Sequence, residues 1–182
     1  LYDNFTPERT HIALTAYYGL VSFMDANVGK VLDALKETGL SKKTQVVYTS
    51  DHGDNIGERG LWGKSNMYEE SVGVPMILAG PNIPSGHVCH TPVSLLDIAP
   101  TVLDLAGVSI PSYMDGKSIF GSEKNDYIFA ARDRLDSFKG KTRAVRNKDY
   151  KFIKNYSLGI VGAQKLSFRE NLMSMKELRK MS

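Results

Sequence analysis

Asp51, His52 and Lys64 are the residues of this chain whose types and spacing are best suited to chemistry. An apolar run stops at Ser50, a polar, glycine-rich stretch carries a lone lysine, and a second apolar run follows at residues 75–80. Two buried strands that frame such a loop would place the three side chains at the edge of a sheet, where open α/β proteins keep their ligand sites. The pattern therefore predicts a site that combines a carboxylate, an imidazole and an ammonium group.

The chemistry of these groups suits a cation and an anionic substrate. A carboxylate beside an imidazole can ligate one divalent cation, but calcium takes about six to eight ligands and zinc about four, so other segments would have to supply the rest. Lys64 follows several glycines and the only Trp, and could place a compact positive charge on a substrate oxygen. Two plainer interpretations stay open, because Asp51 could simply close a strand-to-loop turn and Lys64 could be a solvated surface lysine.

The segments that must position this loop are a helix and two strands. Residues 5–40 predict one long helix, with Thr6 as its cap, Pro7 in its first turn, apolar residues at three- and four-residue spacing, and Gly39 at its end. The β-branched run at residues 45–50 predicts a strand covered on both faces, and hence a parallel one. This order of elements predicts an α/β fold with a mixed, largely parallel sheet sandwiched by helices.

The second half of the chain continues this pattern and then changes it. Residues 94–108 predict a helix that opens with Ser94 and Asp97 in a capping box, is divided by Pro100 and ends at Gly107. Residues 126–132 predict a strand, and residues 143–156 predict an antiparallel hairpin around an Asn-Lys-Asp turn. Residues 171–181 are weakly helical in pattern. We therefore expect residues 1–125 to belong to one domain and residues 126–182 to open a C-terminal subdomain of strands plus a helix.

The composition excludes several classes of function. A formal net charge of +3 over 182 residues does not indicate nucleic acid or membrane binding, and no apolar segment approaches the roughly 20 residues that cross a bilayer. The single cysteine cannot form an internal disulfide. The chain opens on Leu1 with no signal peptide pattern, so we expect it to be the later part of a longer protein. The compartment and oligomeric state stay undetermined, with a periplasmic or secreted location favoured.

Three stretches in order resemble the sulfatase family of the alkaline-phosphatase-like superfamily. They are "AYYGLVSFMDANVGKVLDALKETGL", "TSDHGDNIGERGLWGKSNMYEESVGVPMILAGP" and "TPVSLLDIAPTVLDLAGV". The segment "DYIFAARDRLDSFKGKTRAVRNKDYKFIKNY" is similar to the C-terminal subdomain strands of bacterial sulfatases that act on sulfated sugars. The resemblance implies an alkaline-phosphatase-like fold and a sulfuric ester hydrolase that cleaves a small-molecule or glycan sulfate ester.

The resemblance also implies a role for each site residue. Asp51 and His52 match the later pair of calcium ligands, and Lys64 matches the lysine that contacts the sulfate group. The family's nucleophile is a formylglycine made in a Cys/Ser-x-Pro-x-Arg motif, which this sequence lacks. We therefore expect the nucleophile upstream of this chain, and no turnover by the chain alone. Arg132 and Arg134, near the end of a predicted strand, are candidate substrate contacts from their position only.

Alternative functions remain open at this stage. Phosphonate or phosphodiester hydrolases of the same superfamily resemble this loop, whereas zinc-dependent phosphoethanolamine transferases place a histidine near the position of Lys64. A non-catalytic module could bind a sulfated or phosphorylated polymer through residues 139–154, which hold seven basic residues and one Asp. A sulfatase-like protein that has lost its nucleophile is a further possibility.

Overall fold

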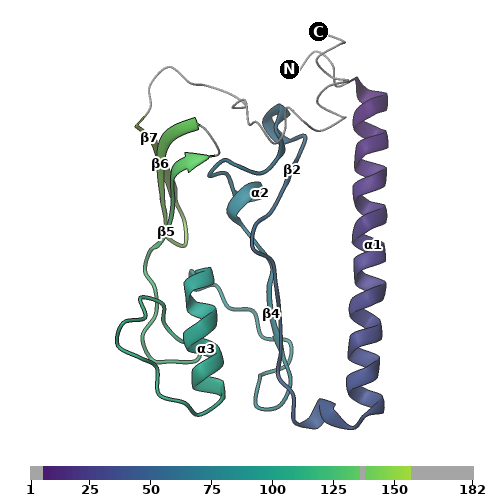
Figure 1. Cartoon of the computed structure of the whole chain (residues 1–182), viewed down its shortest axis with the longest axis vertical. Helices are drawn as coiled ribbons and strands as arrows, with labels where there is room; N and C mark the ends of the chain where they lie inside the picture. The colour runs from purple at the N-terminus through teal and green to yellow at the C-terminus, as the bar shows by residue number, and fades with distance from the viewer. Residues whose placement is uncertain (1–5, 136–137, 157–182) are drawn as a thin grey trace. The chain divides into compact units, whose positions relative to one another are not determined.

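The structure is a computed structural model that describes residues 6–135 and 138–156. These residues form two compact units, and the chain passes from the first to the second between His87 and Val88. The first unit contains α1 (Pro7–Glu37), β1 (Val46–Thr49), β2 (Asn55–Ile56), β3 (Trp62–Gly63), α2 (Glu69–Val72) and β4 (Met76–Ala79) (Figure 1). The second contains α3 (Ile98–Leu105), β5 (Ile128–Leu135), β6 (Phe138–Arg146) and β7 (Lys151–Asn155). The predicted domain boundary at residue 125 lies inside the second unit and stays a prediction.

Helix α1 begins and ends as the sequence predicts. The Thr6 hydroxyl accepts a hydrogen bond from the backbone N–H of Arg9 at 3.3 Å, and Pro7 occupies the first turn. Hydrogen bonds from the backbone and from Thr6 lower the pKa of Glu8 from its ordinary value. After the last helical residue, Gly39 adopts a φ of 71°, a left-handed conformation that glycine tolerates best. None of the described side chains of α1 is fully buried.

Strands β1 and β4 pair in antiparallel fashion, with Val46 opposite Ala79 and Thr49 opposite Met76. A parallel neighbour was expected for residues 45–50, so that expectation is wrong for this pair. The physical reason is that a continuous apolar run reports burial and not strand direction. The connection from β1 to β4 contains the short strands β2 and β3 and the short helix α2 but no full crossover helix, and it brings the chain back in the reverse direction.

In the second unit, the predicted capping box is present at the start of the helical segment. The Ser94 hydroxyl accepts from the N–H of Leu96 at 3.3 Å, and the Asp97 carboxylate accepts from the N–H of Ser94 at 2.8 Å. A 3-10 turn (Leu95–Asp97) precedes α3, so the helix is divided as predicted, but two residues earlier than Pro100. Pro100 instead sits in the first turn of α3, where no N–H is needed.

Strands β5, β6 and β7 form a three-stranded antiparallel sheet in that order. The predicted hairpin between β6 and β7 is confirmed, with Arg146 opposite Lys151. Asn147 shapes its turn, because its side-chain oxygen accepts from the N–H groups of Asp149 and Tyr150 at 2.9 and 2.7 Å. The weakly helical pattern at residues 171–181 lies outside the described residues. Among the described helices, none has the length and apolarity required to span a bilayer.

Candidate functional site

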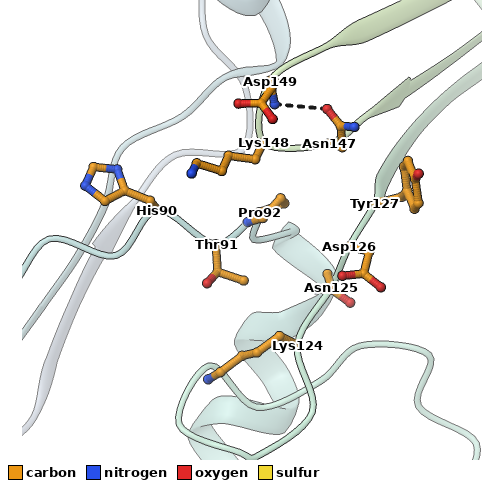
Figure 2. A pocket seen from close by; sticks show the side chains of 10 residues that line it. All are labelled: His90, Thr91, Pro92, Lys124, Asn125, Asp126, Tyr127, Asn147, Lys148 and Asp149. Atoms are coloured by element: carbon orange, nitrogen blue, oxygen red, sulfur yellow. Dashed lines mark hydrogen bonds between the residues drawn. The ribbon is translucent and has the colours of Figure 1, made fainter.

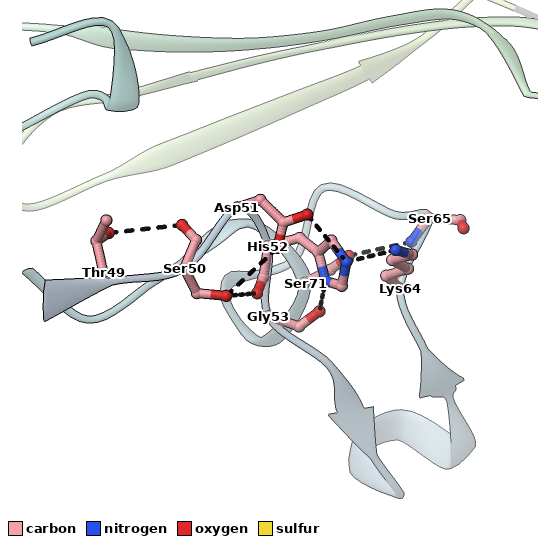
Figure 3. A network of polar contacts seen from close by, with 8 residues as sticks. All are labelled: Thr49, Ser50, Asp51, His52, Gly53, Lys64, Ser65 and Ser71. Carbon is pink, nitrogen blue, oxygen red and sulfur yellow. Dashed lines mark hydrogen bonds and ion pairs between the residues drawn. The ribbon is translucent and has the colours of Figure 1, made fainter. Parts of the chain in front are cut away.

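The turn that follows β1 is fixed by backbone contacts and by a lack of space. The hydroxyl of Ser50 donates to the carbonyl of His52 at 2.8 Å, which closes the turn on itself (Figure 3). The N–H of Gly53 donates to the carbonyl of Ser71 at 2.9 Å. A Cβ atom on Gly53 would lie 2.3 Å from the carbonyl oxygen of Glu70, so only glycine fits here. The position of Asp51 and His52 therefore depends on close packing of this turn against α2.

A small hairpin returns the chain from this turn to Lys64. β2 pairs with β3, so that Asn55 lies opposite Gly63 and Ile56 opposite Trp62. The side chain of Asn55 is 1% exposed and donates to the carbonyl of Gly63 at 2.5 Å. This buried bond ties the two strands together just before Lys64. The hairpin explains how a lysine far along the loop can return to the strand end.

Lys64 and His52 are in direct contact at the mouth of this loop. The Nζ atom of Lys64 contacts Nε2 of His52 in a short hydrogen bond, and Nδ1 of His52 lies 3.0 Å from the carbonyl oxygen of Gly53. Since a carbonyl oxygen can only accept, Nδ1 carries the proton, and in the neutral imidazole Nε2 is left as the acceptor. His52 therefore presents a lone pair at Nε2 that serves one electropositive partner at a time.

Asp51 and His52 also have the spacing of two ligands on one cation. Oδ2 of Asp51 lies 3.6 Å from Nε2 of His52. Two calcium ligands at right angles are about 3.3–3.7 Å apart when each is 2.3–2.6 Å from the ion, so the pair fits. An Nδ1–H group held by a backbone carbonyl is also the usual support of a metal-bound imidazole. No three His, Cys, Asp or Glu side chains of the described residues lie together as a potential cation site, so a cation held by this pair would need further ligands.

Ser71, which the sequence analysis did not single out, holds the loop around Lys64. It is 3% exposed, and its hydroxyl accepts from the N–H of Ser65 at 3.1 Å. Ser65 has a φ of 96°, which is strained for any residue other than glycine. A buried serine that fixes a strained neighbour has no signature in the sequence. Its only sequence signal is that it lies in the short polar segment that returns to β4.

A second contact fastens the same loop to α2. Arg59 pairs with Glu70 at 2.8 Å, and its guanidinium lies 4.5 Å from the centre of the Tyr68 ring. The hydrogen bond to Glu70 raises the pKa of Arg59 from its ordinary value. The sequence suggested only a charged loop face for these residues. The structure shows that this charge pair bridges the two halves of the loop.

Arg132 and Arg134, the candidate substrate contacts, lie on β5 in the second unit. The Arg132 guanidinium is half-buried and donates to the carbonyl of Gly140 at 3.4 Å and to the hydroxyl of Thr142 at 3.3 Å. Burial lowers the pKa of Arg132 from its ordinary value. Arg134 is exposed and lies opposite Lys139. The structure thus brings Asp51, His52 and Lys64 together, and the roles of the two arginines stay predictions.

Comparison with known proteins decides the family. A family profile described as "Sulfatase" matches residues 2–108. The chain belongs to the sulfatase family. A second profile, described as the C-terminal region of N-sulphoglucosamine sulphohydrolase, matches residues 57–161. Among curated sulfatases, the choline-sulfatase of Rhizobium meliloti is 43% identical over 124 residues, which cover 65% of this chain and 24% of the relative. The chain therefore spans only a fraction of the length of the sulfatases that it matches.

Solved structures extend the likeness to both units. The phosphonate monoester hydrolase from Silicibacter pomeroyi matches 85% of this chain and 35% of its own, with a TM-score of 0.75 and 29% identity. A protein solved in complex with its substrate D-glucosamine-2-N,6-O-disulfate matches 78% of this chain and 31% of its own, with a TM-score of 0.64 and 30% identity. The family profile and the curated relatives confirm the sulfatase resemblance, and the structural likenesses confirm the mixed α/β, alkaline-phosphatase-like fold that the sequence predicts.

Proposed function

We propose that this chain is part of a sulfuric ester hydrolase, to which it contributes Lys64 as a sulfate contact and Asp51 and His52 as cation ligands. The observation that carries the proposal is the convergence of these three side chains on one loop, where His52 contacts both of the others. Membership of the sulfatase family supports the reaction class. The calcium ion and the assignment of the three roles come from the resemblance and are parts of the proposal.

The residues of this chain would act by electrostatics. A sulfuryl group in transfer spreads negative charge over its oxygens, so a fixed ammonium group at Lys64 stabilises the transition state more than the ground state. A calcium ion, when bound, would neutralise further charge on the same oxygens. Asp51 and His52 would hold that ion, and the contacts of Gly53 and Ser71 would keep these groups in place. The nucleophile, expected to be a formylglycine, would come from residues that this chain does not contain.

The substrate we propose is a sulfate ester of a small molecule or a glycan. Among the relatives, one is named a choline-sulfatase, and one neighbour was solved with a sulfated glucosamine. Choline sulfate and the sulfated glucosamine both carry a sulfate group in an ester or amide bond to an organic group. A cation and a lysine would polarise that class of bond. The organic group itself would be recognised by other parts of the protein.

The test uses the full-length gene product that contains this chain, co-expressed with a formylglycine-generating enzyme. Calcium-dependent release of sulfate from an aryl sulfate is expected from the wild type. Lys64→Ala should lower kcat/KM by roughly 100- to 1,000-fold, the cost of removing one charge-stabilising donor. Lys42→Ala, at an exposed position after α1, is the matched control and should leave the rate unchanged. A wild-type protein that does not cleave sulfate esters would contradict the proposal.

Phosphonate ester hydrolysis is the second candidate, and the fold likeness to a phosphonate monoester hydrolase favours it. The same preparations should therefore be assayed on an aryl phosphonate. Cleavage of the phosphonate with none of the sulfate would replace the first proposal by this one. A non-catalytic glycan-binding role would instead give salt-sensitive binding that needs no metal and survives Lys64→Ala.

A further inference from the structure

The second unit contains a groove of about 600 Å³ that has no assigned role. It lies between the segment at residues 90–92, the segment at residues 124–127 and the turn at residues 147–149 (Figure 2). Its volume falls within the range of small-molecule sites, which is about 300–1,000 Å³. Most of its lining residues carry a polar group, while the stems of the lysines, Pro92 and the Tyr127 ring add apolar surface, so its ligand should offer both hydrogen bonds and an apolar face.

Two asparagines in the groove are held in one orientation by the protein. The side-chain oxygen of Asn147 accepts the N–H groups of Asp149 and Tyr150, so its Nδ2 is the group left to donate to a ligand. Nδ2 of Asn125 donates to the carboxylate of Asp97 at 2.7 Å, and Asp97 is 2% exposed. The Oδ1 atom of Asn125 is therefore fixed as an acceptor. The groove thus presents at least one oriented donor and one oriented acceptor before any ligand arrives.

The charges that line the groove balance each other. Two lysines, Lys124 and Lys148, and two aspartates, Asp126 and Asp149, line the groove (Figure 2). No ion pair joins these four side chains in the described part of the chain, and Nζ of Lys124 donates to the carbonyl of Ile119 at 2.6 Å. Two positive and two negative groups give no net field that would select a polyanion. The lining does provide both donors and acceptors, and each hydroxyl group of a ligand can use either kind, because it donates and accepts.

Tyr127 adds an aromatic face to this polar lining. Its side chain is 56% exposed and borders the groove beside Asp126 (Figure 2). An aromatic ring offers rigid contact area at a low cost in conformational entropy. Polar groups of both signs around one exposed ring suit a ligand with an apolar face and a rim of hydroxyl groups. Sugar rings in the pyranose form have this character.

We propose that this groove is a carbohydrate-binding site that takes one sugar unit of a glycan through its hydroxyl groups, with Tyr127 against the ring. The proposal goes beyond the hydrolase function, because it requires neither a cation nor turnover. It predicts that the protein holds glycan chains as well as small molecules. Recognition by hydroxyl groups also separates it from a purely electrostatic attraction to sulfate.

The test measures binding to the full-length protein by isothermal titration calorimetry at 150 mM salt. The probes are a heparin-derived hexasaccharide and its desulfated, N-acetylated counterpart, with Lys64→Ala as the background to prevent turnover. Both probes are expected to bind. Tyr127→Ala and Asp126→Asn should each weaken binding of both probes about tenfold, the effect of losing one good contact. Tyr150→Ala is the matched control, because Tyr150 is 80% exposed and does not line the groove.

Three outcomes would overturn the proposal. Neither probe binds; only the sulfated probe binds, which would point to charge alone; or Tyr150→Ala weakens binding as much as Tyr127→Ala. Asp126→Asn replaces an exposed carboxylate by a group of the same shape, so it keeps the test valid if Tyr127→Ala fails to fold. Failure of the hydrolase proposal is seen separately, because an inert protein that binds both probes supports this inference and contradicts only the activity.

Discussion

The Nζ atom of Lys64 is hydrogen-bonded to Nε2 of His52, although the two residues lie 12 positions apart in the chain. The same Nε2 atom lies 3.6 Å from the carboxylate of Asp51, where we propose that a calcium ion binds. His52 thus contacts both the proposed sulfate-binding lysine, Lys64, and the other proposed cation ligand, Asp51. The two ring nitrogens of His52 have different partners: Nδ1 is bound to the Gly53 carbonyl, and Nε2 is directed at Lys64 and Asp51.

His52→Ala should therefore weaken calcium binding at least about tenfold, because the ion loses a ligand that is already oriented. Isothermal titration calorimetry of the full-length protein after chelation and dialysis measures this directly. His87→Ala is the control, since His87 is an exposed histidine of the same unit, and it should bind calcium like the wild type. Equal affinity in His52→Ala and the wild type would remove His52 from the ligand set.

Gly53→Ala should destabilise the first unit by about 1–3 kcal/mol, the typical cost of forcing an extra methyl group into a packed site. The added Cβ atom would lie 2.3 Å from the Glu70 carbonyl oxygen and 2.9 Å from that of Gly73, so the turn or α2 must shift. Urea unfolding reports the loss. Gly29→Ala is the control, because its Cβ meets nothing within 4 Å in α1, and alanine should stabilise the helix by up to about 1 kcal/mol.

Ser71→Ala should lower the free energy of unfolding by about 1–2 kcal/mol and lower the activity attributed to Lys64. The substitution leaves the N–H of Ser65 without the hydroxyl that now accepts it at 3.1 Å, next to the lysine. The expected signature is a fall in kcat/KM together with faster proteolysis of the loop at residues 57–66. Ser22→Ala, which removes an exposed hydroxyl bound to its own helix, should change neither quantity. An active, protease-resistant Ser71→Ala protein would show that the contact is dispensable.

The sequence predicted the parts of this site that have local signals. The stop of an apolar run at Asp51, the capping residues Thr6 and Ser94, and the Asn147 turn all follow from chemistry within a few residues, and the structure contains the caps and the turn. The grouping of Asp51 and Lys64 was predicted from the loop as a whole. Local rules suffice where the interaction partners are near in the chain.

The sequence did not predict what depends on packing between distant segments. The antiparallel pairing of β1 with β4 could not be read from apolar runs, because burial does not encode direction. The roles of Ser71 and Asn55 were missed for a related reason. Each is a buried polar residue whose partner lies six or eight residues away on another arm of the folded loop, and composition shows neither the burial nor the partner.

Substitution of Asp97 tests the packing of the second unit, as Gly53→Ala and Ser71→Ala test that of the first. Its carboxylate is 2% exposed and accepts N–H groups from Ser94 and Lys117, each at 2.8 Å, and from the side chain of Asn125 at 2.7 Å. Asp97→Asn would turn an amide N–H₂ toward one of these donors. We expect it to destabilise the unit by about 1.5–3 kcal/mol, the range for a hydrogen bond to a charged group.

The same substitution should also weaken binding of the desulfated hexasaccharide, because Asn125 loses the anchor that fixes it in the groove. Urea unfolding and titration calorimetry on one preparation separate the two effects. Asp115→Asn, at an exposed position in the same unit, is the control for both. A stable Asp97→Asn protein with wild-type sugar binding would show that the Asp97 carboxylate neither supports α3 nor orients Asn125.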